Sequence, residues 1–435
     1  MTVPDKSAAG RNRAPKRRRR AEAASTGAAT IASAHPSWAS NPIASWLVQH
    51  GGRPSDLAAR LSGLCLGLVA QGLTLRRVHV GIRSTHPEVA ARTVIWERGS
   101  EGTTLIDHGY GLQLSEDYLN SPVRLIHEGA GAFRRRLEGP EVVRDFPVLD
   151  DLIAQGCTDY VIMPLTFSSG QANFISWATD RPGGFTVGEL TLLYDLLPLI
   201  ALRVEIETTR QNMQTLLTTY LGREPARRVL AGSVRRGQVE SIRAAIWISD
   251  LRAFTRLSDR VPIRQVVAIL NDYFEVIARA VEAHGGEILK FTGDGILAIF
   301  NAGPSSREDC ESALAAAREA LARLESDNAE RSAEGLPEIL TGIGLHLGDL
   351  VFGNIGSRDR LDFTVIGPAV NETGRVETLC KVLERPLLVS ASFAEAVGTD
   401  GLQSLGFHVL RGVSTPREIF APRQDAGAKR SRPFS

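Results

Sequence analysis

The alternation of apolar and polar residues predicts two folded regions joined by a helical segment. In the first region, residues 42–205, the apolar runs Tyr160–Phe167 and Asn173–Ala178 flank a Ser-Ser-Gly-Gln turn, which predicts a β-hairpin. Thr186 and Glu189 form a capping box, which predicts the start of a helix. Apolar residues then recur at helical spacing, at Leu190, Leu193, Leu197, Ile200 and Val204. We therefore expect an α/β domain that ends in a helix.

Residues 206–240 are expected to form a helical linker. Met213, Leu216, Leu217 and Tyr220 extend the apolar stripe, and glycines interrupt the sequence from Gly222 onwards. A helix that leaves one domain and enters another can be a plain connector. It can also pair with its twin in a dimer and carry a signal. The sequence leaves both interpretations open.

Residues 241–423 carry the pattern of a third part, with strands and helices in the order β-α-β-β-α-β. That order is the ferredoxin-like split unit, so the fold class expected for the chain is α+β. Ser306 with Asp309 is expected to cap the second helix. The expected elements are Arg243–Ser249, Pro262–His284, Glu287–Thr292, Ile296–Phe300, Arg307–Leu324 and Leu340–Leu347.

Charge is nearly balanced over the 435 residues, with a formal net charge of +1. Bulk electrostatic binding to nucleic acid or membrane is therefore not expected. Basic residues crowd the first twenty positions among Ala, Ser, Gly and Pro, which predicts a disordered tail over residues 1–41, with a second one over 424–435. The basic tail is either a solvated segment or a contact site for an acidic lipid, protein or nucleic acid.

No apolar run reaches the roughly 18 residues that a membrane-spanning helix needs, so no transmembrane segment is expected. The four cysteines, Cys65, Cys157, Cys310 and Cys380, are widely spaced and form neither a zinc pattern nor a disulfide framework. We expect a cytoplasmic protein in which these residues are buried thiols.

Two aspartates mark the candidate chemistry. Asp250 follows an apolar strand, and Asp294 lies in the tight turn Thr292–Gly295 between two strands. In a split unit these strands lie side by side, so the carboxylates would share one edge of the sheet. Adjacent carboxylates raise each other's pKa, and paired magnesium ions would relieve that repulsion. The alternative is that each aspartate is an ordinary turn residue.

Four segments in order resemble the motifs of class III adenylate/guanylate cyclases. These are Ile248–Thr255, Lys290–Gly295, Gly342–Gly348, and Phe363–Asn371 with Arg375. The resemblance covers the third part of the chain. It implies a catalytic domain that converts ATP to 3′,5′-cyclic AMP and pyrophosphate.

The resemblance assigns metal and phosphate contacts to the first two segments. Asp250 and Asp294 would bind two Mg²⁺ or Mn²⁺ ions per active site, with help from the Leu251 carbonyl. Backbone groups around Phe254 and Thr255 would hold the β- and γ-phosphates.

The later motifs would read the nucleotide and stabilise the transition state. Lys290 and Thr364 would bind adenine, Asn371 would orient the ribose, Arg375 would stabilise the transition state, and Arg411 would bind phosphate. An ammonium suits the bare adenine N1, and a hydroxyl oxygen suits the N6 amino group. Guanine presents the reverse pattern at these positions, so ATP is the expected substrate.

The resemblance also implies a homodimer, in which metals from one chain meet base and transition-state residues from the other. Three alternatives remain: a guanylate cyclase, a catalytically inactive cyclase-like regulatory dimer, and a palm-type polymerase or diguanylate cyclase. The sequence contains no Gly-Gly-Asp-Glu-Phe hairpin, which counts against the last alternative.

Three positions depart from the family pattern. Ala253 stands where Gly is frequent, Gly374 lies inside the helix that carries Arg375, and Arg411 replaces a frequent Lys. None of the three removes a metal ligand.

The first region resembles GAF sensory domains in its hairpin-then-helix ending, from Asp159 to Thr186. That resemblance implies regulation by an unknown small-molecule or protein signal. His79, His108 and His127 could bind a cofactor, although lone histidines are more often structural or surface residues.

Overall fold

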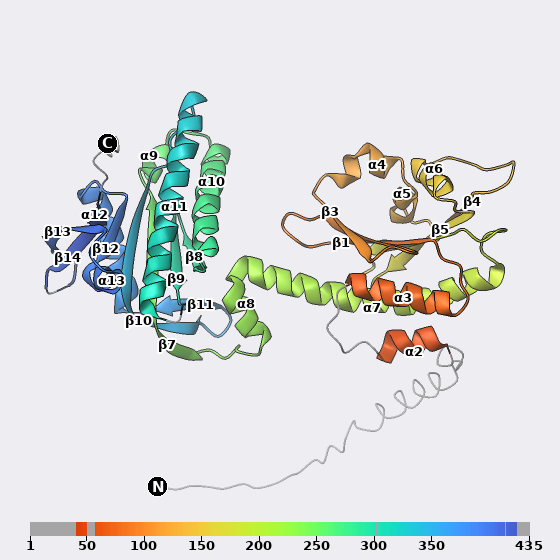
Figure 1. Ribbon diagram of the computed structural model, residues 1–435, viewed down its shortest axis with the longest axis horizontal. Helices are drawn as coiled ribbons and strands as arrows, with labels where there is room; N and C mark the ends of the chain where they lie inside the picture. Colours follow the sequence, from red (N-terminus) through yellow and green to blue (C-terminus); the bar gives the residue numbers. More distant parts are fainter. Residues whose placement is uncertain (1–40, 50–56, 302, 304, 414, 424–435) are drawn as a thin grey trace, which may run out of the picture. The chain divides into compact units, whose positions relative to one another are not determined.

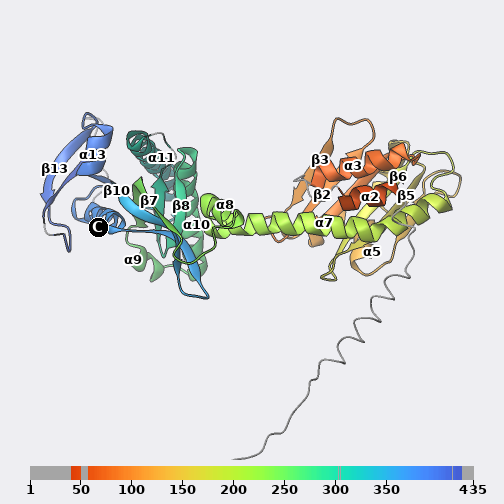
Figure 2. The ribbon, with the colours of Figure 1, turned by 90° about the horizontal axis from the view of Figure 1, so that it is seen from below.

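The computed structural model divides the chain into two compact units, Met1–Asn212 and Met213–Ser435 (Figures 1 and 2). The residues that it describes are 41–49, 57–301, 303, 305–413 and 415–423. Our expectations for the basic N-terminal tail and for the C-terminal tail therefore fall almost wholly outside the described residues.

The N-terminal unit is built on a six-stranded sheet in the order β3-β2-β1-β6-β5-β4. Every strand pair in it is antiparallel, so the unit lacks the parallel crossovers of a doubly wound α/β fold. The predicted hairpin is confirmed as β5 and β6. The strands are β1 Arg77–Arg83, β2 Ala91–Glu97, β3 Thr103–His108, β4 Phe133–Arg136, β5 Asp159–Thr166 and β6 Ala172–Thr179.

Helices cover both faces of this sheet (Figure 1). One apolar core joins α2, α3 and α7 to residues such as Val78 and Val80 of β1. A smaller core on the other face joins α5 and α6 to Tyr160 and Ile162 of β5. The helices are α2 Pro42–Gln49, α3 Leu57–Ala70, the 3₁₀ turn η2 Leu112–Leu114, α4 Glu116–Leu119, α5 Pro122–His127, α6 Pro147–Ala154 and α7 Val187–Leu221.

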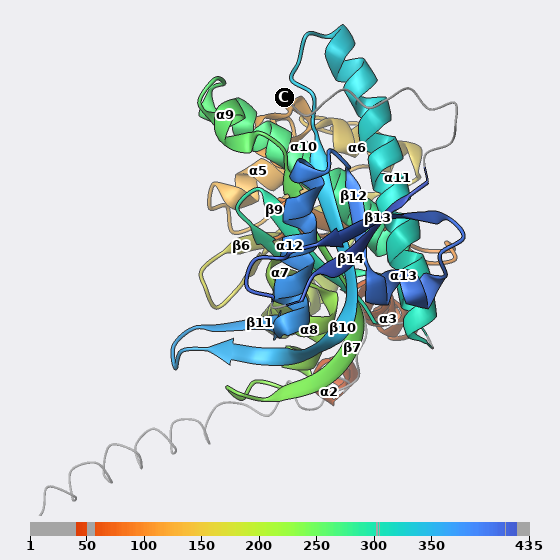
Figure 3. The same cartoon turned by 90° about the vertical axis from the view of Figure 1, so that its left-hand side faces the viewer.

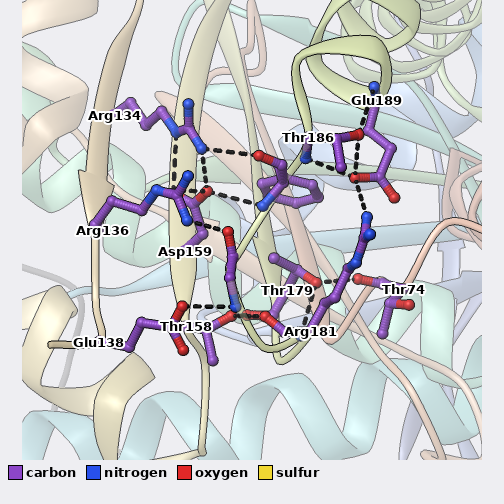
Figure 4. A network of polar contacts seen from close by, with 12 residues as sticks. Thr74, Arg134, Arg136, Glu138, Thr158, Asp159, Thr179, Arg181, Thr186 and Glu189 are labelled. Atoms are coloured by element: carbon purple, nitrogen blue, oxygen red, sulfur yellow. Dashed lines mark hydrogen bonds and ion pairs between the residues drawn. The ribbon is translucent and has the colours of Figure 1, made fainter.

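A polar clamp fixes the loop that leads into α7 (Figure 4). Asp159 is fully buried, and its carboxylate accepts hydrogen bonds from the Arg134 guanidinium and from the backbone N–H of Phe185 at 2.9 Å. The predicted capping box is confirmed, because Glu189 accepts from the Thr186 N–H at 2.7 Å and its own N–H donates to Thr186 Oγ1. The start of α7 is therefore tied directly to the sheet.

The C-terminal unit contains an eight-stranded sheet in the order β13-β14-β12-β10-β7-β9-β8, with β11 paired to β10 (Figure 3). The central order β10-β7-β9-β8, antiparallel throughout, is the predicted split unit. The strands are β7 Val239–Leu251, β8 Glu287–Thr292, β9 Gly295–Phe300, β10 Thr341–Gly356, β11 Leu361–Ile366, β12 Leu387–Ser390, β13 Leu402–His408 and β14 Arg417–Pro422.

Helices pack on both faces of this sheet as well. On one face α10 and α11 pack against alternate β7 residues such as Trp247. On the other face Ala369, at the start of α12, packs with Ile246 of β7 and Phe352 of β10. The helices are α8 Arg223–Leu230, α9 Phe254–Ser258, α10 Ile263–Ala283, α11 Ser306–Ala333, α12 Pro368–Val382 and α13 Ala391–Val397.

The cap predicted for α11 is wrong by one residue. Ser305 is the N-cap, and its hydroxyl accepts from the Glu308 N–H at 3.3 Å. Asp309 instead accepts from the Gly303 N–H at 2.8 Å, so its carboxylate ties down the preceding loop. Ser305 and Ser306 both suit a cap by composition, and the path of the loop selects the first.

The helix predicted for the linker extends to residue 230 with a break at Gly222, where φ is +94°, whereas 231–238 form turns and β7 begins at Val239. A β-carbon on Gly222 would lie 3.0 Å from the Ile288 carbonyl oxygen, so glycine allows the close approach. Within the C-terminal unit, α8 then docks on β8, with the Glu224 N–H donating to Glu287 Oε1 at 2.7 Å.

Two further expectations concern the membrane and the cysteines. Across the described part of the chain, no helix is both long and apolar enough to span a bilayer. The four cysteines are buried free thiols, as expected.

Candidate active site

The structure brings the two predicted metal-binding carboxylates together. Asp250 lies at the end of β7, and Gly295, the residue after Asp294, pairs with it across β7 and β9. The Leu251 N–H donates to the Asp294 carbonyl at 3.2 Å, which ties the turn to the strand end. Gly293 has a φ of +68°, and this left-handed turn aims Asp294 at Asp250. The Asp294 side chain lies close enough for its charge to act on the Asp250 carboxylate.

Burial and mutual repulsion act on this pair in the same direction. Partial burial, and then the neighbouring charge of Asp294, raise the pKa of Asp250 to about 6. Arg252 opposes that rise only in part. Two carboxylates held close together against their own repulsion form a site that favours a bound cation.

The donor set fits magnesium or manganese held jointly with a nucleotide. The described residues include no cluster of three or more His, Cys, Asp or Glu side chains arranged to enclose a metal ion. Mg²⁺ commonly takes only one or two carboxylates and completes its shell with water and substrate phosphates. Asp250 and Asp294, with the Leu251 carbonyl nearby, match that requirement.

The loop after Asp250 leads directly into α9. Ala253 adopts a left-handed conformation, with a φ of +57°, which explains why the family often has glycine there. Phe254 packs partly against the core, whereas Thr255 is exposed. The loop is therefore anchored at Phe254, with Thr255 facing solvent.

The residues predicted to bind the base lie on β8 and β11. Lys290 Nζ lies 3.2 Å from the Asp362 carboxylate, and Thr364 is two residues further along β11, on the same face of the strand as Asp362. Lys290 and Asp362 line a cavity of about 880 Å³. Thr364, Asp250 and Asp294 are not among the residues that line this cavity.

The predicted transition-state residues lie on α12. Asn371 is exposed and Arg375 is partly exposed. A β-carbon on Gly412 would lie 3.5 Å from Arg375 Nη2, so the guanidinium lies beside the 410–413 turn. Arg411, in the same turn, is exposed. The structure therefore brings Arg375 close to the Arg411 turn.

Two residues next to the site were not assigned a role from the sequence. Arg252 and Glu377 form a buried ion pair at 2.9 Å. Burial raises the pKa of Glu377 to about 7, Arg252 opposes this, and Asp250 adds to the rise. Arg252 stood inside a quoted motif, but its partner lies 125 residues away, so no local signal could have joined them.

The N-terminal unit has a small cavity of its own, of about 130 Å³, with Arg83, Tyr118, His108 and His127 among its lining residues. The His127 ring lies 3.0 Å from the Tyr118 hydroxyl, and His108 lies 3.0 Å from Thr93 Oγ1. These hydrogen bonds fit the structural interpretation of both histidines.

His79 does not line that cavity. Burial lowers its pKa to about 3, so the ring is neutral, and its Nε2 is buried without a hydrogen-bond partner in the described structure. A histidine cofactor site therefore stays an untested prediction.

Comparison with known proteins shows which protein family the C-terminal unit matches. The family model described as "Adenylate and Guanylate cyclase catalytic domain" matches residues 238–396. An uncharacterized protein of Mycobacterium tuberculosis (strain CDC 1551 / Oshkosh) is 35% identical over 220 residues, which cover 49% of this chain and 38% of that protein. "Adenylate cyclase 1" of Rhizobium meliloti (strain 1021) is 34% identical over 173 residues, which cover 40% of this chain and 26% of that protein.

Among solved structures, the guanylyl cyclase Cya2 is 34% identical and has a TM-score of 0.38, with 42% of this chain and 91% of that chain covered. The chain spans well under half the length of the two curated relatives. The family match covers the region that holds Asp250 and Asp294. Residues 238–396 of the C-terminal unit thus form a catalytic domain of the class III adenylate/guanylate cyclase family.

Proposed function

We propose that this chain is an adenylate cyclase that converts ATP to 3′,5′-cyclic AMP and pyrophosphate at a site shared by two copies. The observation that carries the proposal is that Asp250 and Asp294 are neighbours at the sheet edge, where Asp250 pairs with Gly295. A carboxylate whose pKa is raised by burial and a like charge is typical of functional sites. Asp250 belongs to that class.

The reaction is an in-line displacement. The ribose 3′-oxygen bonds to the α-phosphorus, the bond to the bridging oxygen of pyrophosphate breaks, and the 3′-hydroxyl proton is released. Two divalent ions, when bound by Asp250 and Asp294, would supply charge stabilisation for the attacking and leaving oxygens. Backbone groups near Phe254 and Thr255, together with Arg411, would hold the phosphates. Arg375 would face the charge that develops in the transition state.

Adenine selection would rest on Lys290 and Thr364. The Asp362 carboxylate lies 3.2 Å from the Lys290 ammonium and so limits where the ammonium can lie. An ammonium donor matches adenine N1, and the Thr364 hydroxyl can accept from N6. Guanine carries a donor at N1, which an ammonium cannot accept, so the Lys290 contact would be lost and guanine binding disfavoured. The Thr364 hydroxyl can donate to guanine O6, so discrimination would rest mainly on Lys290.

A site shared by two copies would account for the placement of the carboxylates and of the α12 residues. Glu377 of α12 faces Arg252, near the carboxylate pair, whereas Asn371 is exposed and Arg375 lies beside the 410–413 turn. A second copy related by a two-fold axis would bring its own Asn371 and Arg375 to the carboxylates, and would receive the same in return. Two equivalent sites per homodimer would result.

We further propose that the N-terminal unit regulates this activity. Its clamp at Asp159 fixes the start of α7, so a change in the unit can alter that helix. The GAF-like resemblance and the signal that it senses stay predictions.

The substrate test is a product assay on purified protein with Mn²⁺ and either ATP or GTP. We expect cyclic AMP from ATP. Lys290→Glu should move the ratio of ATP to GTP turnover toward GTP by at least about 10-fold, because a carboxylate accepts from guanine N1–H. Cyclic GMP without cyclic AMP from the wild-type protein would contradict the adenine assignment.

A mixing experiment tests the shared site. Asp250→Ala and Arg375→Ala chains should each be inactive alone. Random re-pairing gives mixed dimers with one intact site, so the mixture should regain about a quarter of wild-type activity. No recovery in mixed dimers verified by mass would contradict a site built from two chains.

A further inference from the structure

Arg252 and Glu377 join two parts of the chain that would serve different active sites in the proposed homodimer. Arg252 follows Asp250 by two residues, in the loop that leads to the phosphate-binding segment. Glu377 follows Arg375 by two residues on α12. The pair therefore spans from the metal-binding corner to the helix that carries the transition-state residues.

The contact between them is buried and double. Arg252 Nη2 lies 2.9 Å from the Glu377 carboxylate and also donates to the Glu377 backbone carbonyl at 3.2 Å. Only 12% of the Arg252 side chain and 10% of the Glu377 side chain are exposed. The carboxylate contact is an ion pair, since Glu377 Oε1 has no hydrogen-bond partner in the described structure. The hydrogen bond to the backbone carbonyl fixes the guanidinium to α12, so the arginine holds the position of the helix itself.

Two glycines of β10 make room for this contact. Gly342 pairs with Asp250 across β7 and β10, and a β-carbon there would lie 1.6 Å from Arg252 Nη2. A β-carbon on Gly344 would lie 2.6 Å from the backbone nitrogen of Glu377. β10 therefore carries no side chain at the two positions where the guanidinium crosses the sheet and where α12 packs on it.

Stability alone is a weak explanation for such a pair. Replacing a buried ion pair by apolar residues of similar volume is often neutral or stabilising, whereas its fixed geometry can specify position. Here the fixed position is that of Asn371 and Arg375 relative to the Asp250 loop of the same chain.

We propose that Arg252 and Glu377 are positioning residues that couple the two active sites of the homodimer. The inference rests on the proposed function, in which each chain gives its carboxylates to one site and its α12 residues to the other. One chain's ion pair then sets the metal half of the first site and the transition-state half of the second. Breaking it on one chain damages both sites, each in a different way.

Mixed dimers with a single intact site separate these two effects. Asp250→Ala chains supply only Asn371 and Arg375 to that site, and Arg375→Ala chains supply only the carboxylates. Glu377→Gln on the Asp250→Ala chain should lower kcat at saturating Mn²⁺ by about 10-fold, with the Mn²⁺ requirement unchanged. The same substitution on the Arg375→Ala chain should raise the Mn²⁺ concentration for half-maximal activity by about 10-fold.

A matched control breaks a different ion pair of the same unit. Asp272→Asn removes the partner of Arg331, 3.0 Å away between α10 and α11, and should change neither kcat nor the Mn²⁺ requirement on either chain. Arg252→Met combined with Glu377→Met removes both buried charges, so this double variant should keep the melting temperature while it loses activity.

The outcomes are distinct. Complementation that survives Glu377→Gln on either chain overturns the coupling role and leaves the shared site intact. An effect from only one of the two placements also overturns it, because the pair would then serve one site. A fully active Met/Met double variant contradicts positioning by the ion pair. Absence of complementation before Glu377 is changed overturns the shared site, and the coupling with it.

Discussion

Asp159 in the N-terminal unit and Asp250 in the C-terminal unit are both withdrawn from water, yet their surroundings differ. Asp159 is fully buried, and arginine and backbone N–H groups satisfy its oxygens (Figure 4). Asp250 is half-buried beside a second carboxylate, and its pKa is raised to about 6. Protein groups pair fully with the Asp159 carboxylate, whereas burial and Asp294 disfavour the ionised form of Asp250.

The difference is the one expected between a structural carboxylate and the proposed metal-binding one. Charge-assisted hydrogen bonds around Asp159 hold the start of α7, so its role is complete within the chain. The Asp250 and Asp294 pair is strained as long as both are ionised, and a divalent cation would relieve it. Variants of each residue should therefore fail in opposite ways.

The largest effect is expected for Asp294→Asn. Removing one of two metal-binding carboxylates should lower cyclase activity by at least about 100-fold, comparable to the loss of a major electrostatic contributor. The melting temperature should stay the same or rise, because the like charge beside Asp250 is gone. Enzyme assays and thermal melts measure the two effects, with the exposed Asp349→Asn as the control. If Asp294→Asn retained activity, Asp294 would not be a metal ligand.

Asp159→Asn should show the opposite behaviour. It leaves Arg134, whose side chain is 33% exposed, without its carboxylate partner and removes charge-assisted hydrogen bonds, which costs about 1.5–3 kcal/mol of folding free energy. Urea melts followed by tryptophan fluorescence would measure this loss. In the fraction of the variant that stays folded, cyclase activity should depend on Mn²⁺ concentration as it does in the wild-type protein. An unchanged melt would mean that the clamp does not hold the unit together.

The pH dependence of stability gives a third contrast. Because its folded-state pKa is raised, Asp250 keeps a proton that the unfolded chain has lost. The folded state therefore loses stability as pH rises from about 4 to about 6, and the loss then levels off. Mn²⁺ should stabilise the protein more at pH 8 than at pH 5, since the ion binds the ionised pair. Asp294→Asn should weaken both trends without abolishing them, because burial is the larger cause of the raised pKa of Asp250. An equal Mn²⁺ effect at the two pH values in the wild-type protein would contradict the assignment.

The smallest effect concerns backbone strain at Ala253. An alanine held in a left-handed conformation costs about 1–2 kcal/mol of folding free energy. Glycine relieves that strain, but it loses about 0.5–1 kcal/mol more than alanine in backbone entropy on folding. Ala253→Gly should therefore raise the melting temperature by at most about 4 °C and lower the KM for ATP. Glu384, also left-handed with a φ of +49°, supplies the control. Glu384→Gly should alter stability similarly and leave KM unchanged, and equal KM shifts in both variants would argue against a role of the loop in phosphate binding.

Local patterns predicted much of this fold. The capping box at Thr186, the bounds of β8 and the break at Gly222 all follow from neighbouring residues, and the structure confirms them. The cap of α11 at Ser305 could not be fixed, because two adjacent serines suit a cap equally and the tertiary path of the loop decides between them.

The candidate site divides in the same way. The strand order implied by β-α-β-β-α-β was enough to predict that Asp250 and Asp294 meet. The pairing of Arg252 with Glu377 and of Lys290 with Asp362 depends on how α12 and β11 pack, which no local spacing encodes. The roles of Asn371, Arg375 and Arg411 stay predictions, since they require a second copy and a nucleotide.

The most direct test of the metal assignment is a Mn²⁺ titration by electron paramagnetic resonance with 3′-deoxy-ATP, which lacks the attacking hydroxyl. The wild-type protein should bind two Mn²⁺ ions per nucleotide site, and Asp294→Asn should lose at least one while it stays folded. Equal Mn²⁺ binding by the two proteins would contradict the claim that this carboxylate pair holds the ions.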